Sequence, residues 1–261
     1  MSIARVLAFL AFGGGVISSP TPQEQIRGEL RERQNRSVDL SSLNACHMDD
    51  SESCDIASLP TTTATLVYPG GDTECIGGDA FAFEVLPGKD TSKLLFYFQG
   101  GGACWDQMSS KVPLCSQQLY TNSPLGIFDV AEKENPFADF TFVTVLYCSG
   151  DLHLANNKTQ DGWVTARGET VRQTGQQNVW ATIQWVKANL PSPLSSLVIS
   201  GESAGSLGMQ GWSKALLQEL PADVAVLFMD SYLGVFPEGT QGPILRDVSM
   251  PSMSLPRGMP C

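Results

Sequence analysis

The chain has 261 residues, of which 42% are hydrophobic and 16% are charged, so it can bury a core, and disorder along its whole length is excluded. Its formal net charge is −11. A protein this acidic offers no basic surface to nucleic acid or to an anionic membrane, so neither is expected as a partner. The length favours one α/β domain over two domains.

Residues 1–19 are typical of a secretory signal peptide. One basic residue, Arg5, precedes the apolar run 6–12, and the small residues Ser18 and Ser19 follow at the expected cleavage point. The run is too short to span a bilayer, which takes about 20 residues. A buried N-terminal helix is the alternative, but the triple glycine at 13–15 is a poor helix interior. We therefore expect a secreted, extracellular protein with no membrane span.

The cysteines support the same route. None of the seven forms a C-x-x-C pair, which favours disulfides over a zinc site, and no metal or cofactor is predicted. Cys46 with Cys54, and Cys104 with Cys115, are close enough to form local disulfides, whereas the full pairing stays open, with Cys261 as the candidate odd thiol. Two N-x-[ST] glycosylation sequons occur, at 35–37 and 157–159.

The chain divides into four segments by composition. After the signal peptide, residues 20–59 are polar and lack apolar periodicity, so they are interpreted as a leader or linker without core residues. Residues 60–245 form the predicted domain. Residues 246–261 are rich in proline and methionine and are predicted to be an irregular tail.

Within the domain, predicted strands and helices alternate. Apolar and β-branched runs indicate strands at 63–68, 80–86, 93–98, 140–147, 196–200 and 224–229. Apolar residues at helical spacing indicate helices at 176–190 and 204–220. Such alternation is typical of parallel βαβ units, so the predicted fold class is α/β, doubly wound, with a mostly parallel sheet flanked by helices.

The predicted strand 196–200 runs directly into Gly201-Glu202-Ser203-Ala204-Gly205, and a predicted helix follows at once. This G-x-S-x-G in a strand-to-helix turn is the context of a nucleophile elbow, in which the serine hydroxyl stands above the sheet edge. Ser203 is therefore the candidate nucleophile. The N–H of Ala204, at the start of the helix, is a candidate oxyanion donor. An ordinary glycine turn is the alternative interpretation.

A glycine triplet, Gly100-Gly101-Gly102, follows the buried strand 93–98. Glycines at this position let backbone amides approach a substrate carbonyl closely, as in the oxyanion loop of esterases. The segment lacks the G-K-[ST] that a phosphate loop requires. A flexible turn remains the alternative.

Four segments together resemble the pectin acetylesterase/Notum family of secreted α/β hydrolases, over about residues 65–236. They are FQGGGAC at 98–104, YCSGD at 147–151, GESAGSLG at 201–208 and Asp230-Ser231. The resemblance implies an α/β-hydrolase-like sheet, with Ser203 as nucleophile and Gly101, Gly102 and Ala204 as oxyanion donors. Family members typically carry a tryptophan where this chain has Ala103, which bears on the acyl pocket.

The rest of the catalytic triad is less clear from the sequence. A serine nucleophile needs a base and an acid, which in α/β hydrolases follow it along the chain, yet no histidine follows Ser203. The resemblance places both groups beyond residue 261, so the fold is expected to be incomplete at the C-terminus. Asp230, at a strand end, and His153, in the loop after another strand, are the candidate substitutes as acid and base, with a turn-capping Asp and a surface His as the alternatives.

Two functions follow from these patterns. The first is a secreted serine carboxylesterase that hydrolyses acyl esters, with acetyl esters on a cell-wall polysaccharide as the expected substrate. The second is a catalytically impaired or non-enzymatic member of the family, or a gene fragment that lacks the triad Asp and His. The absence of a histidine after Ser203 is the feature that keeps the second function open.

Overall fold

The computed structural model describes residues 40, 43–48, 54–122, 125–156 and 159–231. Several sequence predictions lie outside the described residues: the signal peptide at 1–19, both sequon asparagines, the tail at 246–261 and Cys261.

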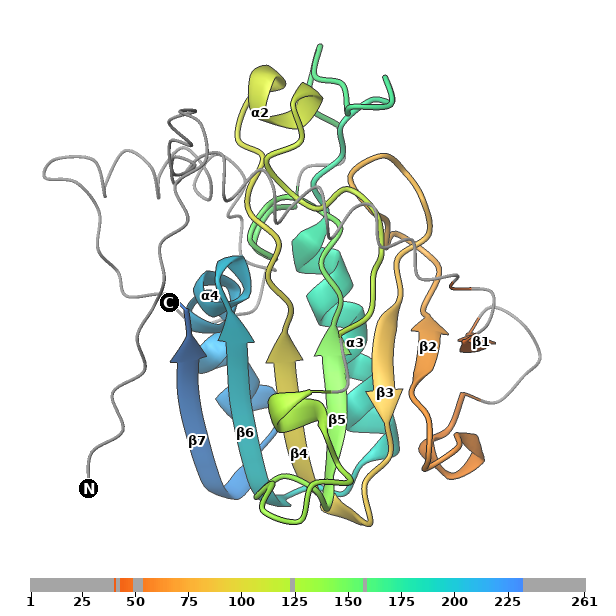
Figure 1. Ribbon diagram of the computed structural model, residues 1–261, viewed down its shortest axis with the longest axis vertical. Helices are drawn as coiled ribbons and strands as arrows, with labels where there is room; N and C mark the ends of the chain where they lie inside the picture. Colours follow the sequence, from red (N-terminus) through yellow and green to blue (C-terminus); the bar gives the residue numbers. More distant parts are fainter. Residues whose placement is uncertain (1–39, 41–42, 49–53, 123–124, 157–158, 232–261) are drawn as a thin grey trace, which may run out of the picture.

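Seven strands form one mixed sheet in the order β1-β2-β3-β5-β4-β6-β7 (Figure 1). The strands are β1 (Asn44–His47), β2 (Thr65–Tyr68), β3 (Phe83–Leu86), β4 (Asp90–Phe98), β5 (Phe140–Val145), β6 (Leu194–Glu202) and β7 (Ala222–Asp230). Strand β3 runs antiparallel to β2 and β5, whereas the four other neighbouring pairs are parallel. The predicted α/β class with a mostly parallel sheet is confirmed, and each predicted strand is present.

The two long helices, α3 (Gly175–Asn189) and α4 (Ala204–Glu219), lie behind the sheet in Figure 1 and contact each other. The front face carries the long β4–β5 connection, which contains the short 3₁₀ helix η3 (Gly126–Phe128). Crossovers that progress in opposite directions across a sheet lie on opposite faces, which explains this arrangement. The predicted flanking helices are present, and the front connection contains three prolines, which disfavour a long helix there.

The central strands explain why the apolar runs were continuous. Residues 94–98 of β4 are buried on both faces of the sheet, so both alternating sets of side chains are apolar. Helix α3 buries Val179, Ile183 and Val186 at helical spacing, and it ends before Pro191. Two further short helices, α2 (Gln107–Lys111) and η2 (Ile56–Ser58), were not predicted.

Part of the predicted leader belongs to the sheet. Strand β1 pairs in parallel with β2, and a disulfide joins Cys46 to Cys54. The indole Nε1 of Trp185 donates to the carbonyl of Cys54 at 3.0 Å, and Leu59 is buried. This differs from the expectation of a leader without core residues. Backbone pairing and a disulfide hold a polar segment in place without apolar periodicity.

All six described cysteines are paired. The two local disulfides that the sequence favoured are present, Cys46–Cys54 and Cys104–Cys115. The third, Cys75–Cys148, joins residues 73 positions apart, a pairing that the sequence left open. Among the helices described here, none has both the length and the apolar character needed to cross a bilayer.

Candidate active site

Ser203 occupies a sharp turn between β6 and α4. Its backbone has φ 50° and ψ −118°, a conformation that costs energy for a residue with a side chain, and its side chain is exposed. The flanking glycines permit the turn: a Cβ on Gly205 would lie 2.0 Å from the carbonyl oxygen of Phe98, and one on Gly201 would lie 2.5 Å from that of Gly205. Strand, glycines and helix together have the geometry of a nucleophile elbow.

Backbone contacts to the neighbouring strand hold this turn. The Ser203 N–H donates to the carbonyl oxygen of Asp230 at 3.0 Å. The buried Ser206 hydroxyl lies 2.6 Å from the Gly201 carbonyl oxygen and 2.7 Å from that of Asp230. Three elements, β6, α4 and β7, therefore fix the strained conformation of Ser203.

The glycine triplet passes directly beside Ser203. A Cβ on Gly100 would lie 3.2 Å from the Ser203 Cβ. Gly101 and Gly102 have φ values of 152° and 72°, which glycine adopts without strain, and the Gly101 carbonyl accepts from the Ser116 N–H at 2.8 Å. Within the described part of the chain, the N–H groups of Gly101 and Gly102 donate to no other residue.

Ala204 is the first residue of α4, so its N–H has no intrahelical partner and lies at the positive end of the helix dipole. The structure thus brings an exposed hydroxyl, free backbone donors of a glycine loop and a helix N-terminus to one edge of the sheet. This arrangement is suited to holding the negative charge that develops when a hydroxyl attacks an ester carbonyl.

Buried polar side chains hold the glycine loop in place through hydrogen bonds. The Tyr147 hydroxyl donates to the Gly102 carbonyl at 2.9 Å and accepts from the Leu152 N–H at 2.9 Å. Gln99 is fully buried, and its side-chain Oε1 accepts from the Tyr147 N–H at 2.9 Å. Its Nε2 donates to the Asn122 side chain at 2.8 Å. The loop is therefore anchored at both its start and its end.

His153, the candidate substitute base, is buried, with 1% of its surface exposed. Its Nε2 lies 2.9 Å from the Gln99 carbonyl oxygen, and its ring packs between those of Phe98 and Tyr147. Burial lowers the pKa of His153 to about 4, so the ring is neutral at pH 7 and its Nε2 donates to Gln99. This placement favours a role in holding the glycine loop over that of a general base.

The other histidine, His47, is exposed on β1 and stacks on the Tyr68 ring. Strand β1 forms the edge of the described sheet farthest from β7. The Ser203 hydroxyl has no hydrogen-bond partner among the residues that the structure describes.

Two aspartates lie near this edge, one exposed and one buried. Asp230 is exposed, its carboxylate accepts from the Ser231 hydroxyl at 3.0 Å, and its backbone carbonyl supports the elbow. Asp151 is fully buried and accepts from the Ser149 hydroxyl at 2.6 Å and from the Gly175 N–H at 2.8 Å. Burial raises the pKa of Asp151 to about 6. Asp151 orders the loop after β5 and ties it to the start of α3.

Sequence reasoning missed the supporting residues Gln99, Tyr147 and Ser206. Gln99 gave one signal, since it is a lone amide between a buried apolar strand and a glycine triplet. A polar group in such a position is expected to find buried partners. Tyr147 and Ser206 gave none, because tyrosine at a strand end and serine in a first helical turn are both common.

Similarity to known proteins is found in a sequence profile and in solved structures. No sequence among the curated proteins is similar enough to count as a match. Two crystal forms of the Wnt deacylase Notum from Drosophila are similar in structure, with TM-scores of 0.47 and 0.45 and sequence identities of 18% and 19%. The matched regions cover 65% and 69% of this chain and 52% and 56% of the Notum chains. This chain therefore spans about half the length of those structures. The sequence profile of the pectinacetylesterases matches residues 61–242, which is more than half of the chain, and the chain therefore belongs to the pectinacetylesterase family.

Proposed function

We propose that this chain is a secreted serine carboxylesterase domain that hydrolyses acyl esters, with acetyl esters on a cell-wall polysaccharide as its substrate. The observation that carries the proposal is the exposed Ser203 hydroxyl on a strained turn, directly beside a glycine loop with free amide donors. Membership of the pectinacetylesterase family supports the ester chemistry and the acetyl group. Three disulfides support an extracellular location.

In the proposed reaction, the Ser203 oxygen attacks the ester carbonyl carbon and its proton passes to a base. The carbonyl oxygen, now negative, is held by the N–H groups of Gly101, Gly102 and Ala204. The carbon–oxygen bond to the alcohol then breaks, the alcohol leaves with a proton, and water releases the acid from the serine in a second, equivalent attack.

The base is the open part of this proposal. His153 is engaged by the Gln99 carbonyl and His47 stacks on Tyr68, so neither orients the Ser203 hydroxyl in the described structure. Asp230 stays a candidate acid because its carboxylate is exposed at the same sheet edge. Without a triad base, binding and the oxyanion hole alone still give rates of roughly 10³ to 10⁴ over water. A catalytically impaired member of the family is therefore the second candidate function.

The experiment is active-site labelling with a fluorophosphonate, together with hydrolysis of p-nitrophenyl acetate and release of acetate from acetylated pectin. We expect labelling of the wild type and its complete loss in Ser203→Ala. Ser213→Ala, on the same helix and away from the turn, is the matched control and should label like the wild type. Folded wild-type protein that neither labels nor hydrolyses either ester would support the impaired member instead.

A further inference from the structure

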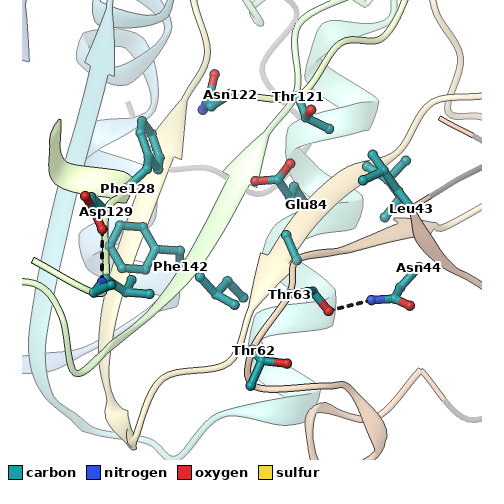
Figure 2. A pocket seen from close by; sticks show the side chains of 15 residues that line it. Leu43, Asn44, Thr62, Thr63, Glu84, Thr121, Asn122, Phe128, Asp129 and Phe142 are labelled. Atoms are coloured by element: carbon teal, nitrogen blue, oxygen red, sulfur yellow. Dashed lines mark hydrogen bonds between the residues drawn. The ribbon is translucent and has the colours of Figure 1, made fainter. Parts of the chain in front are cut away.

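A cavity lies on the front face of the sheet, away from the Ser203 edge. Its volume is about 620 Å³, and its floor is formed by side chains of β2, β3 and β5 (Figure 2). Leu66 lies opposite Glu84 in the β2–β3 pair, and Leu86 lies opposite Phe142 in the β3–β5 pair, so these four side chains share one face. None of the lining residues belongs to the elbow or to the glycine loop.

Glu84 is the unusual member of this floor. Figure 2 shows its carboxylate between the rings of Phe128 and Phe142 on one side and Leu43 and Asn44 on the other. It has no hydrogen bond or ion pair with any residue that the structure describes. Glu84 is half-buried, so its carboxylate is reached from the cavity rather than enclosed by protein. The cavity therefore contains a carboxylate that no described residue pairs.

Asn122 is a second unsatisfied group at the same cavity. Its Oδ1 accepts from Gln99, which fixes the orientation of the amide, and its Nδ2 is buried without a hydrogen-bond partner. The Oδ1 and Nδ2 of an asparagine are told apart by their hydrogen bonds, and here the bond from the Gln99 Nε2 identifies the Oδ1. The Asn122 Nδ2 is shielded from solvent, whereas the half-buried Glu84 carboxylate is accessible from the cavity.

The charges of the lining residues indicate which class of ligand the cavity can bind. Among the described lining residues, Glu84 and Asp129 are the two titratable ones, and none is Lys, Arg or His. The Asp129 carboxylate accepts from the Ala131 N–H at 3.1 Å, whereas Glu84 accepts from no described residue. Two phenylalanine rings supply apolar contact and can also attract a cation through their faces.

We propose that this cavity binds a small organic cation, a protonated amine carried on an apolar or aromatic body, with its ammonium group on the Glu84 carboxylate. The ammonium donates to Glu84, and the body lies against Phe128 and Phe142. The site is independent of the esterase chemistry, so Ser203→Ala leaves its affinity unchanged.

The test is isothermal titration calorimetry at pH 8 with 2-phenylethylammonium as probe and the neutral 2-phenylethanol, of nearly the same shape, as comparison. We expect the ammonium to bind at least about tenfold more tightly, as a charge-assisted hydrogen bond provides. Glu84→Gln should abolish that preference, and Glu132→Gln, on the connection outside the cavity, should keep it. Equal affinity of the two probes, or a preference that survives in Glu84→Gln, overturns the proposal.

A pH series provides the second measurement if Glu84→Gln fails to fold. Burial raises the pKa of Glu84 to about 7, so the wild type should bind the ammonium more weakly as the pH falls from 8 to 5.5 and the carboxylate takes up a proton. The same fall is expected in Asp129→Asn, since Asp129 is the other titratable residue among the described lining residues. An affinity independent of pH, or a dependence lost in Asp129→Asn, contradicts a role for Glu84.

Discussion

At Glu84 a carboxyl group lies on a sheet face that otherwise carries Leu66, Leu86 and Phe142. Burial raises its pKa from 4.5 to about 7. Because the folded pKa is higher than the unfolded one, the folded protein binds this proton more tightly. Its contribution to stability is therefore full below about pH 4.5 and is lost as the pH rises through about 7.

Glu84→Gln removes this dependence on pH. At pH 8 we expect the free energy of unfolding to rise by about 1–2 kcal/mol, because the variant avoids a charge in apolar surroundings. At pH 5, where most of the wild-type contribution remains, the gain should be much smaller. Urea unfolding at both values measures this, with Glu132→Gln as control. An equal gain at pH 5 and pH 8 would show that charge is not the cause.

Residues of the site differ in how far the sequence predicted them. Ser203 and its glycines were identifiable because a turn between two adjacent elements is encoded locally. The supports of the glycine loop were not, because their contacts are distant along the chain: Tyr147 lies 45 residues from Gly102, and His153 lies 54 residues from Gln99. His153 shows what sequence cannot predict, since a histidine in a loop after a strand looks the same in sequence whether it is exposed or buried.

The same distinction holds for whole elements. Strands β4 and β6 were predicted because burial on both faces leaves a continuous apolar run. Strand β1 was not, since its sequence Asn-Ala-Cys-His has no apolar periodicity and its place depends on pairing with β2 and on the Cys46–Cys54 disulfide. The front connection shows the same effect, because prolines exclude a long helix there while Phe128 and Phe137 still cover the sheet.

Strand β7 is the exposed edge of the described sheet, next to β6. Val224, Val226, Leu227 and Met229 are exposed on it, Val224 by 57%. An apolar edge with unpaired backbone groups invites association with another chain.

We expect the chain expressed alone to associate, with a sedimentation coefficient that rises with protein concentration. Val226→Lys should reduce this association, since a charged edge side chain opposes strand pairing. Met108→Lys, on the exposed side of α2, is the control for added charge and should leave association unchanged. A wild type that is monomeric and melts cooperatively over the whole concentration range would contradict the prediction.

At the scale of the molecule, the Cys75–Cys148 disulfide connects the segment before β3 to the loop after β5. Backbone bonds reinforce it: Ile76 N–H donates to the Cys148 carbonyl at 2.8 Å, and Cys104 N–H donates to the Gly150 carbonyl at 2.8 Å. The loops around the sheet edge are thus held to one another as well as to the sheet.

Removing this disulfide should cost more stability than removing a local one, because a longer closed loop restrains the unfolded chain more. For a separation of 73 residues the expected loss in Cys75→Ala/Cys148→Ala is about 4 kcal/mol, against about 2.5 kcal/mol for Cys46→Ala/Cys54→Ala, with its separation of 8. Chemical unfolding of both double variants measures the difference. Equal losses would mean that native contacts, rather than chain entropy, set the contribution of each bond.

Ala103 follows the glycine triplet, and its N–H donates to the Leu114 carbonyl at 3.2 Å, while its methyl group makes no polar contact. The backbone at this position is therefore held by another segment, and the side chain is partly buried against the main hydrophobic core. If the proposed esterase chemistry holds, enlarging residue 103 is expected to change which acyl groups fit without replacing the proposed oxyanion donors. A protein engineer could then alter selectivity separately from the chemistry.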